Sequence, residues 1–516
     1  MKWKLGVAIG LAILGVGLAV LVLTKVFSVD ALVYARGTDS TTLDPAEVEY
    51  GEDAKVTENI FETLVGFKGD TTGIEPRLAT SWTVADGGKK WAFQLRKGVK
   101  FHDGTDLDAG DVVFTFDRIL KPDHPHRPKG VPYGEIFGFI EKVEASGDAV
   151  VFTLKQPNAT FLQVLALFGA AIVGPEAVKK HGPGFSRNPC GTGPYRLHRW
   201  RQGEKLVLER FGDYWGPKPA ISRVVFLPVA SAQTAIEKLK NGEVHIVDHV
   251  TLADVKIVES SPGMRIESET SLNVCYLGFN SKKFPYNDPN FRRAVALAID
   301  RDELNQIVYY GQGEPARNLV PPAIWRDIGD LPTYEFNIEK AKDHLKKVDL
   351  PPDFRPELWH MAFARPYVPE PDRLAEYVRN QLRKIGLELA IQKFEKAAWG
   401  EKTKDPDHPM YILGWSADYA DPDNFYHALL AGGAKNELNS SFWEHAEFND
   451  LVVRAQSEQD ERKRKDLYLR AAMIYREEMP TLPLVHVKQL AACSRKVKYD
   501  LHPIEVRLYP VTFQNP

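Results

Sequence analysis

An apolar segment near the N-terminus constrains this chain more than any other feature of its sequence. Lys2 and Lys4 precede an uninterrupted run of apolar and small residues over positions 5–24, which is long enough to cross a bilayer as a helix. Because positive charge is retained on the cytoplasmic side, we expect the rest of the chain to fold outside the cytoplasm, in the periplasm or at the cell surface.

Two interpretations of this segment stay open. Residues 1–30 could form a signal peptide, with weak cleavage sites that end at Ala31 and Ala35, or the helix over 5–24 could remain as an anchor in the inner membrane. The run is longer than a typical signal core, and no cysteine follows it that could carry a lipid. We therefore favour the uncleaved anchor.

The composition of the chain excludes a broad nucleic-acid surface. The 516 residues include 66 Lys and Arg against 69 Asp and Glu, a net charge of -3, whereas nucleic-acid binding needs a clustered positive excess. This length is too great for one core and predicts several domains. Cys190, Cys275 and Cys493 lie far apart, so they allow at most one disulfide and form none of the close pairs that metal sites use.

The first half of the body is rich in hairpins. Residues 91–95 alternate as in a strand, a helix opens at Ala109, and two strands over 140–145 and 149–154 flank a Ser-Gly-Asp turn. These patterns predict a small α+β subdomain.

The second half has a different pattern that begins with a lobe boundary near Ser268. We expect one long helix over 291–309, then a strand over 357–362, a helix over 373–385 and a strand over 387–392. Such an order of strand, helix and strand predicts an α/β lobe.

One cluster of acidic residues and a histidine resembles a metal-binding site, but we reject that interpretation. Its members are His102, Asp103, Asp106, Asp108 and Asp111. Their spacing does not place oxygens at alternate positions closed by a distal glutamate, as a calcium loop requires, and turn and helix-cap roles explain them better. We predict neither a metal site nor a cofactor.

Residues 414–425 contain an unusually high number of charged and aromatic side chains: three carboxylates and three aromatic rings, together with a proline. The apolar residues 411–413 predict a buried strand, and residues 421–424 are typical of a turn, so Asp418 should lie just past a strand end. A charge held there can face a cleft. From these residues alone, a loop that merely packs over Trp415 is an equally good interpretation.

Several motifs in a fixed order resemble a known family. They are Leu-Arg-Lys-Gly-Val-Lys-Phe-His-Asp-Gly-Thr from Leu95, Asp-Val-Val-Phe-Thr-Phe-Asp from Asp111, and Phe-Arg-Arg-Ala-Val-Ala-Leu-Ala-Ile-Asp from Phe291. Together with residues 79–82, 191–195 and 364–371, they resemble the family 5 solute-binding proteins of bacterial ABC importers, the dipeptide and oligopeptide binders, over about residues 32 to 516. Agreement of many motifs in one order is far more specific than any single motif.

The resemblance implies an α/β fold of two hinged lobes, the type II periplasmic-binding-protein architecture, with an extra α+β subdomain inserted in the first lobe. The expected division places lobe 1 at 31–75, 185–267 and 485–516, the inserted subdomain at 76–184, and lobe 2 at 268–484. It also implies a monomer that delivers its ligand to the permease subunits of an ABC transporter.

The resemblance further implies roles for two charged residues. Asp418 matches the aspartate that pairs with the ligand's α-ammonium in peptide-binding relatives, and Arg365 matches the arginine that pairs with the α-carboxylate in dipeptide-binding relatives. Val368 stands where those relatives carry asparagine, so the length of the peptide stays open. We expect Trp415, Tyr367 and Tyr419 to line the same cleft.

Such a pair complements a zwitterion, because a guanidinium binds a carboxylate through two donors and an aspartate accepts from an ammonium. A dipeptide predicts a separation of roughly 10–13 Å between the two groups when the lobes are closed. Two alternatives remain: the same fold could bind a nickel chelate, haem or an oligosaccharide, or the chain could be an exported hydrolase. The sequence shows no Gly-x-Ser-x-Gly or His-Glu-x-x-His motif, which disfavours the hydrolase.

Overall fold

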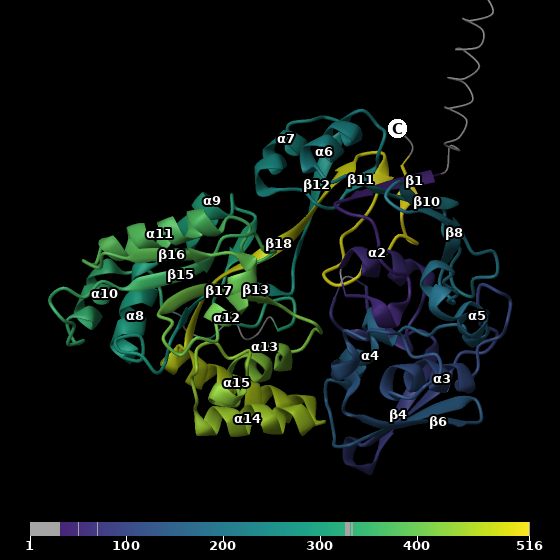
Figure 1. Ribbon diagram of the computed structural model, residues 1–516, viewed down its shortest axis with the longest axis horizontal. Helices are drawn as coiled ribbons and strands as arrows, with labels where there is room; N and C mark the ends of the chain where they lie inside the picture. Colours follow the sequence, from purple (N-terminus) through teal and green to yellow (C-terminus); the bar gives the residue numbers. More distant parts are fainter. Residues whose placement is uncertain (1–30, 50, 70, 326–330, 332–333, 515–516) are drawn as a thin grey trace, which may run out of the picture.

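The computed structural model describes residues 31–49, 51–69, 71–325, 331 and 334–514. The helix expected over residues 5–24 lies outside these ranges. Within them, no helix is both long enough and apolar enough to cross a bilayer. The described chain forms two lobes side by side, and we call the lobe that contains β1 lobe 1 and the lobe that contains β13 lobe 2 (Figure 1).

A sheet of 12 strands extends through both lobes. In spatial order its strands are β16 (Ala390–Phe394), β15 (Glu357–Met361), β17 (Met410–Ser416), β13 (Asn273–Phe279), β18 (Thr481–Ser494), β11 (Ile246–Val247), β1 (Ala31–Arg36), β10 (Arg223–Pro228), β9 (Lys205–Arg210) and β8 (Tyr195–Arg201), while β12 (Met264–Thr270) and β14 (Gly313–Pro315) pair with β18. The lobes are therefore joined through strands and not through a loose linker.

The connection between the lobes is built on β18, the longest strand with 14 residues. Its first residues pair with β13 in lobe 2, and its last residues pair with β12 and with β11 in lobe 1. Only residues 271 and 272 separate β12 from β13, so β12 runs beside β18 from one lobe to the other (Figure 1). Two antiparallel strands thus connect the lobes, and we call this connection the hinge.

Each lobe has its own hydrophobic core. The core of lobe 2 includes Phe291, Leu358 and Leu382, and that of lobe 1 includes Leu32 and Phe93. A smaller cluster lies between the outer face of the lobe 1 strands and helices α6 (Ala232–Lys240) and α7 (Val255–Glu259). Each lobe thus has a close-packed interior of its own.

A separate four-stranded sheet lies in the part of lobe 1 where the sequence predicts an α+β subdomain. Its order is β4 (Ala79–Ala85), β5 (Lys90–Leu95), β7 (Ala149–Leu154) and β6 (Ile140–Ser146), and helix α3 (Ala109–Leu120) packs on it. Asp108 begins the helix, because its Oδ1 accepts from Gly110 N at 2.7 Å while Asp111 Oδ2 accepts from Asp108 N at 2.8 Å. The expected helix-cap roles of these two acids are confirmed.

The remaining elements are short strands and the other helices. They are α2 (Gly51–Ile60), β2 (Val65–Phe67), β3 (Ile74–Pro76), α4 (Phe161–Leu165), α5 (Pro175–His181), α8 (Pro289–Ala298), α9 (Arg301–Val308), α10 (Ile338–Leu345), α11 (Pro371–Arg383), α12 (Lys396–Lys402), α13 (Asp423–Leu430), α14 (Ala446–Ser457), α15 (Glu461–Glu478), β19 (Val497–Lys498) and β20 (Thr512–Phe513). All three cysteines are buried and unpaired.

One predicted helix is wrong in its extent. The single helix expected over 291–309 is two helices, α8 and α9, because the side chain of Asp300 accepts from Asp302 N and Glu303 N and starts a new helix. An aspartate satisfies the free amides of a helix start well enough to interrupt an apolar periodicity that continues across it.

Candidate ligand-binding site

Asp418 lies where the sequence placed it, just past the end of a buried strand. β17 ends at Ser416 and α13 begins at Asp423. The intervening turn is fastened by Asn424, whose Oδ1 accepts from Asp418 N and from Trp415 Nε1, both at 2.9 Å. One amide side chain therefore fixes both the charged residue and the neighbouring indole.

The three acids of this loop have different surroundings. Asp421 accepts two hydrogen bonds from Arg464, each 2.7 Å long, and Asp423 accepts from Tyr419 Oη at 2.8 Å and from Gln456 Nε2 at 3.2 Å. Asp418 makes no ion pair with any described residue. Burial raises the pKa of its carboxyl above the ordinary value, and a hydrogen bond with Asn424 opposes that rise. The negative charge of Asp418 is thus half-buried and has no cationic partner among the residues described.

Arg365 lies at the base of a tight turn. Its N–H donates to Val368 O at 3.0 Å, and Val368 N donates back to Arg365 O at 2.9 Å, which leaves Pro366 and Tyr367 at the tip. The guanidinium carbon lies 5.7 Å from the centre of the Tyr367 ring. Arg365 is exposed and, like Asp418, pairs with no carboxylate among the described residues.

Sheet topology places these two charges on the same edge. β15 and β17 are parallel neighbours; Arg365 follows the carboxyl end of β15, and Asp418 follows the carboxyl end of β17. The Tyr367 ring also packs directly on Gly414 of β17, since a Cβ added there would lie 2.3 Å from Tyr367 Cδ2. Ligands of open α/β sheets bind outside the carboxyl ends of the strands, which is where both side chains lie.

Lobe 1 approaches the same loop from the other side. Burial raises the pKa of Tyr133, and the charges of Asp418 and Glu49 raise it further. Ala420 belongs to the lobe 1 core, against which Ala417 and Tyr419 also pack. Asp418 therefore lies at the boundary between the lobes. The sequence did not single out Tyr133 or Glu49, because neither belongs to a local motif.

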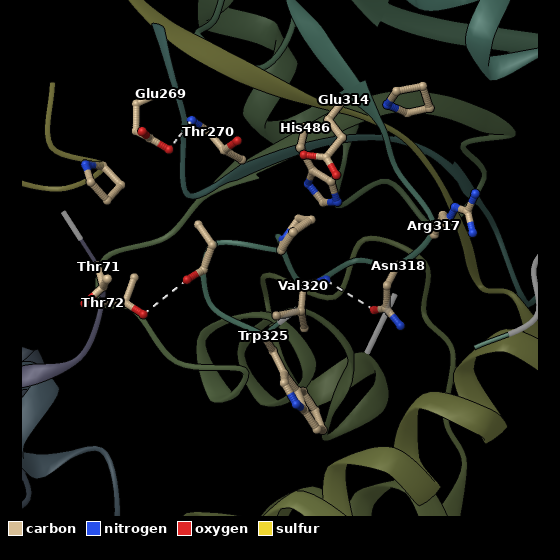
Figure 2. A pocket seen from close by; sticks show the side chains of 14 residues that line it. Thr71, Thr72, Glu269, Thr270, Glu314, Arg317, Asn318, Val320, Trp325 and His486 are labelled. Atoms are coloured by element: carbon tan, nitrogen blue, oxygen red, sulfur yellow. Dashed lines mark hydrogen bonds between the residues drawn. The ribbon is translucent and has the colours of Figure 1, made fainter. Parts of the chain in front are cut away.

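A cavity of about 600 Å³ lies beside the hinge, between the two lobes. Thr71, Thr72 and Pro503 border it from lobe 1, while β12, β14, β18 and the loop over 317–325 form the rest of its wall (Figure 2). The hydroxyl of Thr72 donates to Ala323 O at 3.2 Å across the lobes. This volume lies within the range of pockets that bind small ligands.

Comparison with known proteins gives a consistent result. The model of the bacterial extracellular solute-binding proteins, family 5 Middle, matches residues 73–437. The chain is 32% identical to the dipeptide-binding protein of Escherichia coli over 95% of this chain and 96% of that protein. It is 30% identical to heme-binding protein A of Haemophilus influenzae over 92% and 90% of the two chains.

A solved structure agrees with these relatives. The periplasmic binding protein DppA of Helicobacter pylori in complex with the peptide STSA has a TM-score of 0.75 and 32% identity, with 94% of this chain and 98% of that chain covered. The expected two-lobed α/β fold is confirmed by this likeness. From its sequence, its fold and these relatives, the chain belongs to the bacterial extracellular solute-binding proteins of family 5.

Proposed function

We propose that this protein captures di- or short oligopeptides between its lobes outside the cytoplasm and delivers them to the permease of an ABC transporter, without catalysing a reaction. The observation that carries the proposal is the pair of opposite charges at one sheet edge, Asp418 and Arg365, neither of which has an ionic partner among the described residues. The names of the E. coli and H. pylori relatives support peptide as the ligand.

In this proposal Asp418 binds the α-ammonium of the peptide and Arg365 binds its α-carboxylate. At 4 Å an ion pair contributes about 4 kcal/mol at an effective dielectric constant of 20, against about 1 kcal/mol in water. Exclusion of water therefore decides the affinity. Trp415 and Tyr419, which are both half-buried, would flank the peptide and provide that apolar enclosure. Tyr367 was expected beside them, but its ring is buried against Gly414 in the lobe 2 core, so it would support the turn that carries Arg365.

Closure would follow from bending at β12 and β18. We propose that the rigid bodies are lobe 1 (31–75, 185–267 and 485–516) with the inserted subdomain (76–184), and lobe 2 (268–484). A bound dipeptide would bring the carboxylate of Asp418 and the guanidinium of Arg365 to roughly 10–13 Å. The protein would act as a monomer held at the inner membrane by residues 5–24.

Calorimetric titration of the full-length protein in nanodiscs tests the ligand class. Ala-Ala should bind, while N-acetyl-Ala-Ala and Ala-Ala-amide should each bind about 30-fold more weakly or worse, because each leaves one charge of the site unpaired. Hemin serves as the competing ligand. Tighter binding of hemin than of every peptide, or release of alanine from Ala-Ala, would contradict the proposal.

Paired variants test the two residues separately. Asp418→Ala should abolish the preference for a free ammonium, and Arg365→Ala should abolish the preference for a free carboxylate. Asp353→Ala and Arg355→Ala are matched controls, because both residues are exposed and lie at the opposite end of β15. If Asp418→Ala and Arg365→Ala bind all three peptides as the wild type does, the site is elsewhere.

A further inference from the structure

The two lobes also meet below the hinge in the view of Figure 1, where α14 of lobe 2 reaches the four-stranded sheet region of lobe 1. The backbone N–H of Ala159, in the loop between β7 and α4, donates to the carbonyl oxygen of Gln456 in α14 at 2.7 Å. The side chain of Gln459 lies against Gly88 in the loop between β4 and β5, since a Cβ added to that glycine would be 3.0 Å from it. Both contacts cross from one lobe to the other, so a hinge motion would make or break them.

The side chain of Gln456 also holds the loop that carries Asp418. Its Nε2 donates to Asp423 Oδ2 at 3.2 Å, and the same oxygen accepts from Tyr419 Oη at 2.8 Å. Asp423 is only 3% exposed, and its Oδ1 has no hydrogen-bond partner among the residues that the structure describes. A buried carboxylate with so few donors depends on each of them, so loss of the glutamine donor should displace Asp423.

A displacement of Asp423 would reach Asp418 through one neighbouring residue. Asn424 follows Asp423 directly, and its Oδ1 is the acceptor that fixes Asp418 N at 2.9 Å. Burial raises the pKa of Asp423, while the nearby His427 and the hydrogen bond from Gln456 oppose that rise. The donor from α14 therefore stabilises both the charge and the position of the residue at the start of α13.

We propose that Gln456 is a positioning residue for peptide binding, which links the placement of Asp418 to the contact between the lobes. Its side chain holds the start of α13, and its carbonyl oxygen holds lobe 1 through Ala159. Peptide binding at Asp418 and the contact at Ala159 should then strengthen each other, because coupling between two sites is reciprocal. The inference rests on the proposed peptide-binding function and adds the route by which binding at the loop is transmitted to lobe 1.

Hydrogen exchange at residue resolution, on the full-length protein in nanodiscs, tests this link without a substitution. Saturating Ala-Ala should slow exchange at the Ala159 amide by about tenfold or more, because the peptide favours the state in which this N–H is bonded to Gln456. The amide of Lys155 is the matched control, since it donates to Phe139 O at 2.9 Å within lobe 1, and its rate should not change. An unchanged rate at Ala159 with Ala-Ala bound would refute the link.

Calorimetry of Gln456→Glu tests the role of the side chain. The substitution keeps the size of the residue but places a carboxylate, in place of a donor, beside Asp423. Because Asp418 is then displaced, the preference for Ala-Ala over N-acetyl-Ala-Ala should fall from about 30-fold to about threefold, while the preference over Ala-Ala-amide, which depends on Arg365, should stay at the wild-type level. Gln306→Glu is the matched control, since Gln306 is exposed on α9 of the same lobe, and it should keep both preferences.

The outcomes separate this inference from the proposed function. If Gln456→Glu keeps the preference for a free ammonium, or loses both preferences together, Gln456 does not position Asp418, and the inference is refuted while peptide binding stands. If this variant does not fold, the exchange rate at Ala159 in the wild type still decides the matter. If Ala-Ala does not bind the wild type, both are refuted.

Discussion

Replacement of Gly414 by alanine tests whether the turn that carries Arg365 is positioned by β17. The added Cβ would lie 2.3 Å from Cδ2 of Tyr367 and 2.5 Å from the backbone oxygen of Val274. The Tyr367 ring is buried and would have to move by about 1 Å to regain van der Waals contact. Because Arg365 and Tyr367 share one tight turn, the guanidinium should move with the ring.

Two magnitudes follow from this clash. Overpacking of a well-packed site costs about 1–3 kcal/mol of unfolding free energy, and we expect the upper half of that range because one obstacle is backbone. Displacement of Arg365 should also weaken the binding of Ala-Ala by about tenfold, since a guanidinium and a carboxylate bind best in one bidentate geometry. Urea unfolding measures the first effect and calorimetry the second.

A second glycine provides the control. Gly400 lies in α12, and nothing is within 4 Å of a Cβ placed there, so Gly400→Ala should raise the stability by up to about 1 kcal/mol and leave the affinity unchanged. A Gly414→Ala protein that is as stable as the wild type and binds Ala-Ala equally well would refute the close contact between β17 and the turn. In a double-mutant cycle, Gly414→Ala should cost less stability in the Tyr367→Ala background than in the wild type, because one of the two obstacles is gone.

Three further predictions concern charged groups. Asp421→Asn leaves the largely buried Arg464 unpaired and should cost about 3 kcal/mol in urea unfolding, whereas Asp450→Asn, in a pair exposed by more than half, should cost less than about 1 kcal/mol. Burial and a neighbouring carboxylate raise the pKa of Glu58 to about 8, so the folded state holds this proton more tightly than the unfolded state. The unfolding free energy should therefore fall as pH rises from about 4.5 to 8, and Glu58→Gln should flatten that slope by roughly 2 kcal/mol once partial exposure is allowed for. Because the pKa of Asp418 is raised, peptide affinity should fall as acidification protonates it, and Asp418→Asn should remove this acid limb in calorimetry; an unchanged pH profile would contradict its role.

Local patterns in the sequence predict the surroundings of Asp418 well. The apolar residues 411–413 form part of β17. The turn expected over 421–424 is shorter than predicted, because α13 begins at Asp423 and leaves only Asp421 and Pro422 in the turn. These features depend on residues close together in the chain, where periodicity and capping are informative. The single helix expected over 291–309 is wrong, because the cap at Asp300 starts a new helix within an apolar periodicity that continues across it.

The residues that line the hinge cavity cannot be predicted from local sequence patterns, for a physical reason. Glu269, Glu314 and His486 come together only because β12 and β14 both pair with β18, and no local motif encodes a pairing across some two hundred residues. The same is true of Tyr133 beside Asp418. The two-lobed architecture was predicted from the family resemblance, whereas the residues alone indicated only an α+β region followed by an α/β region.

The position of β18 in both lobes has a consequence for the order in which the chain can fold. During synthesis from the N-terminus, β1 and β11 are made early. However, β11 can pair with its second neighbour, β18, only after Thr481–Ser494 has been made. Contacts between segments this far apart close slowly. Lobe 1 therefore stays unfinished until almost the whole polypeptide has been synthesised.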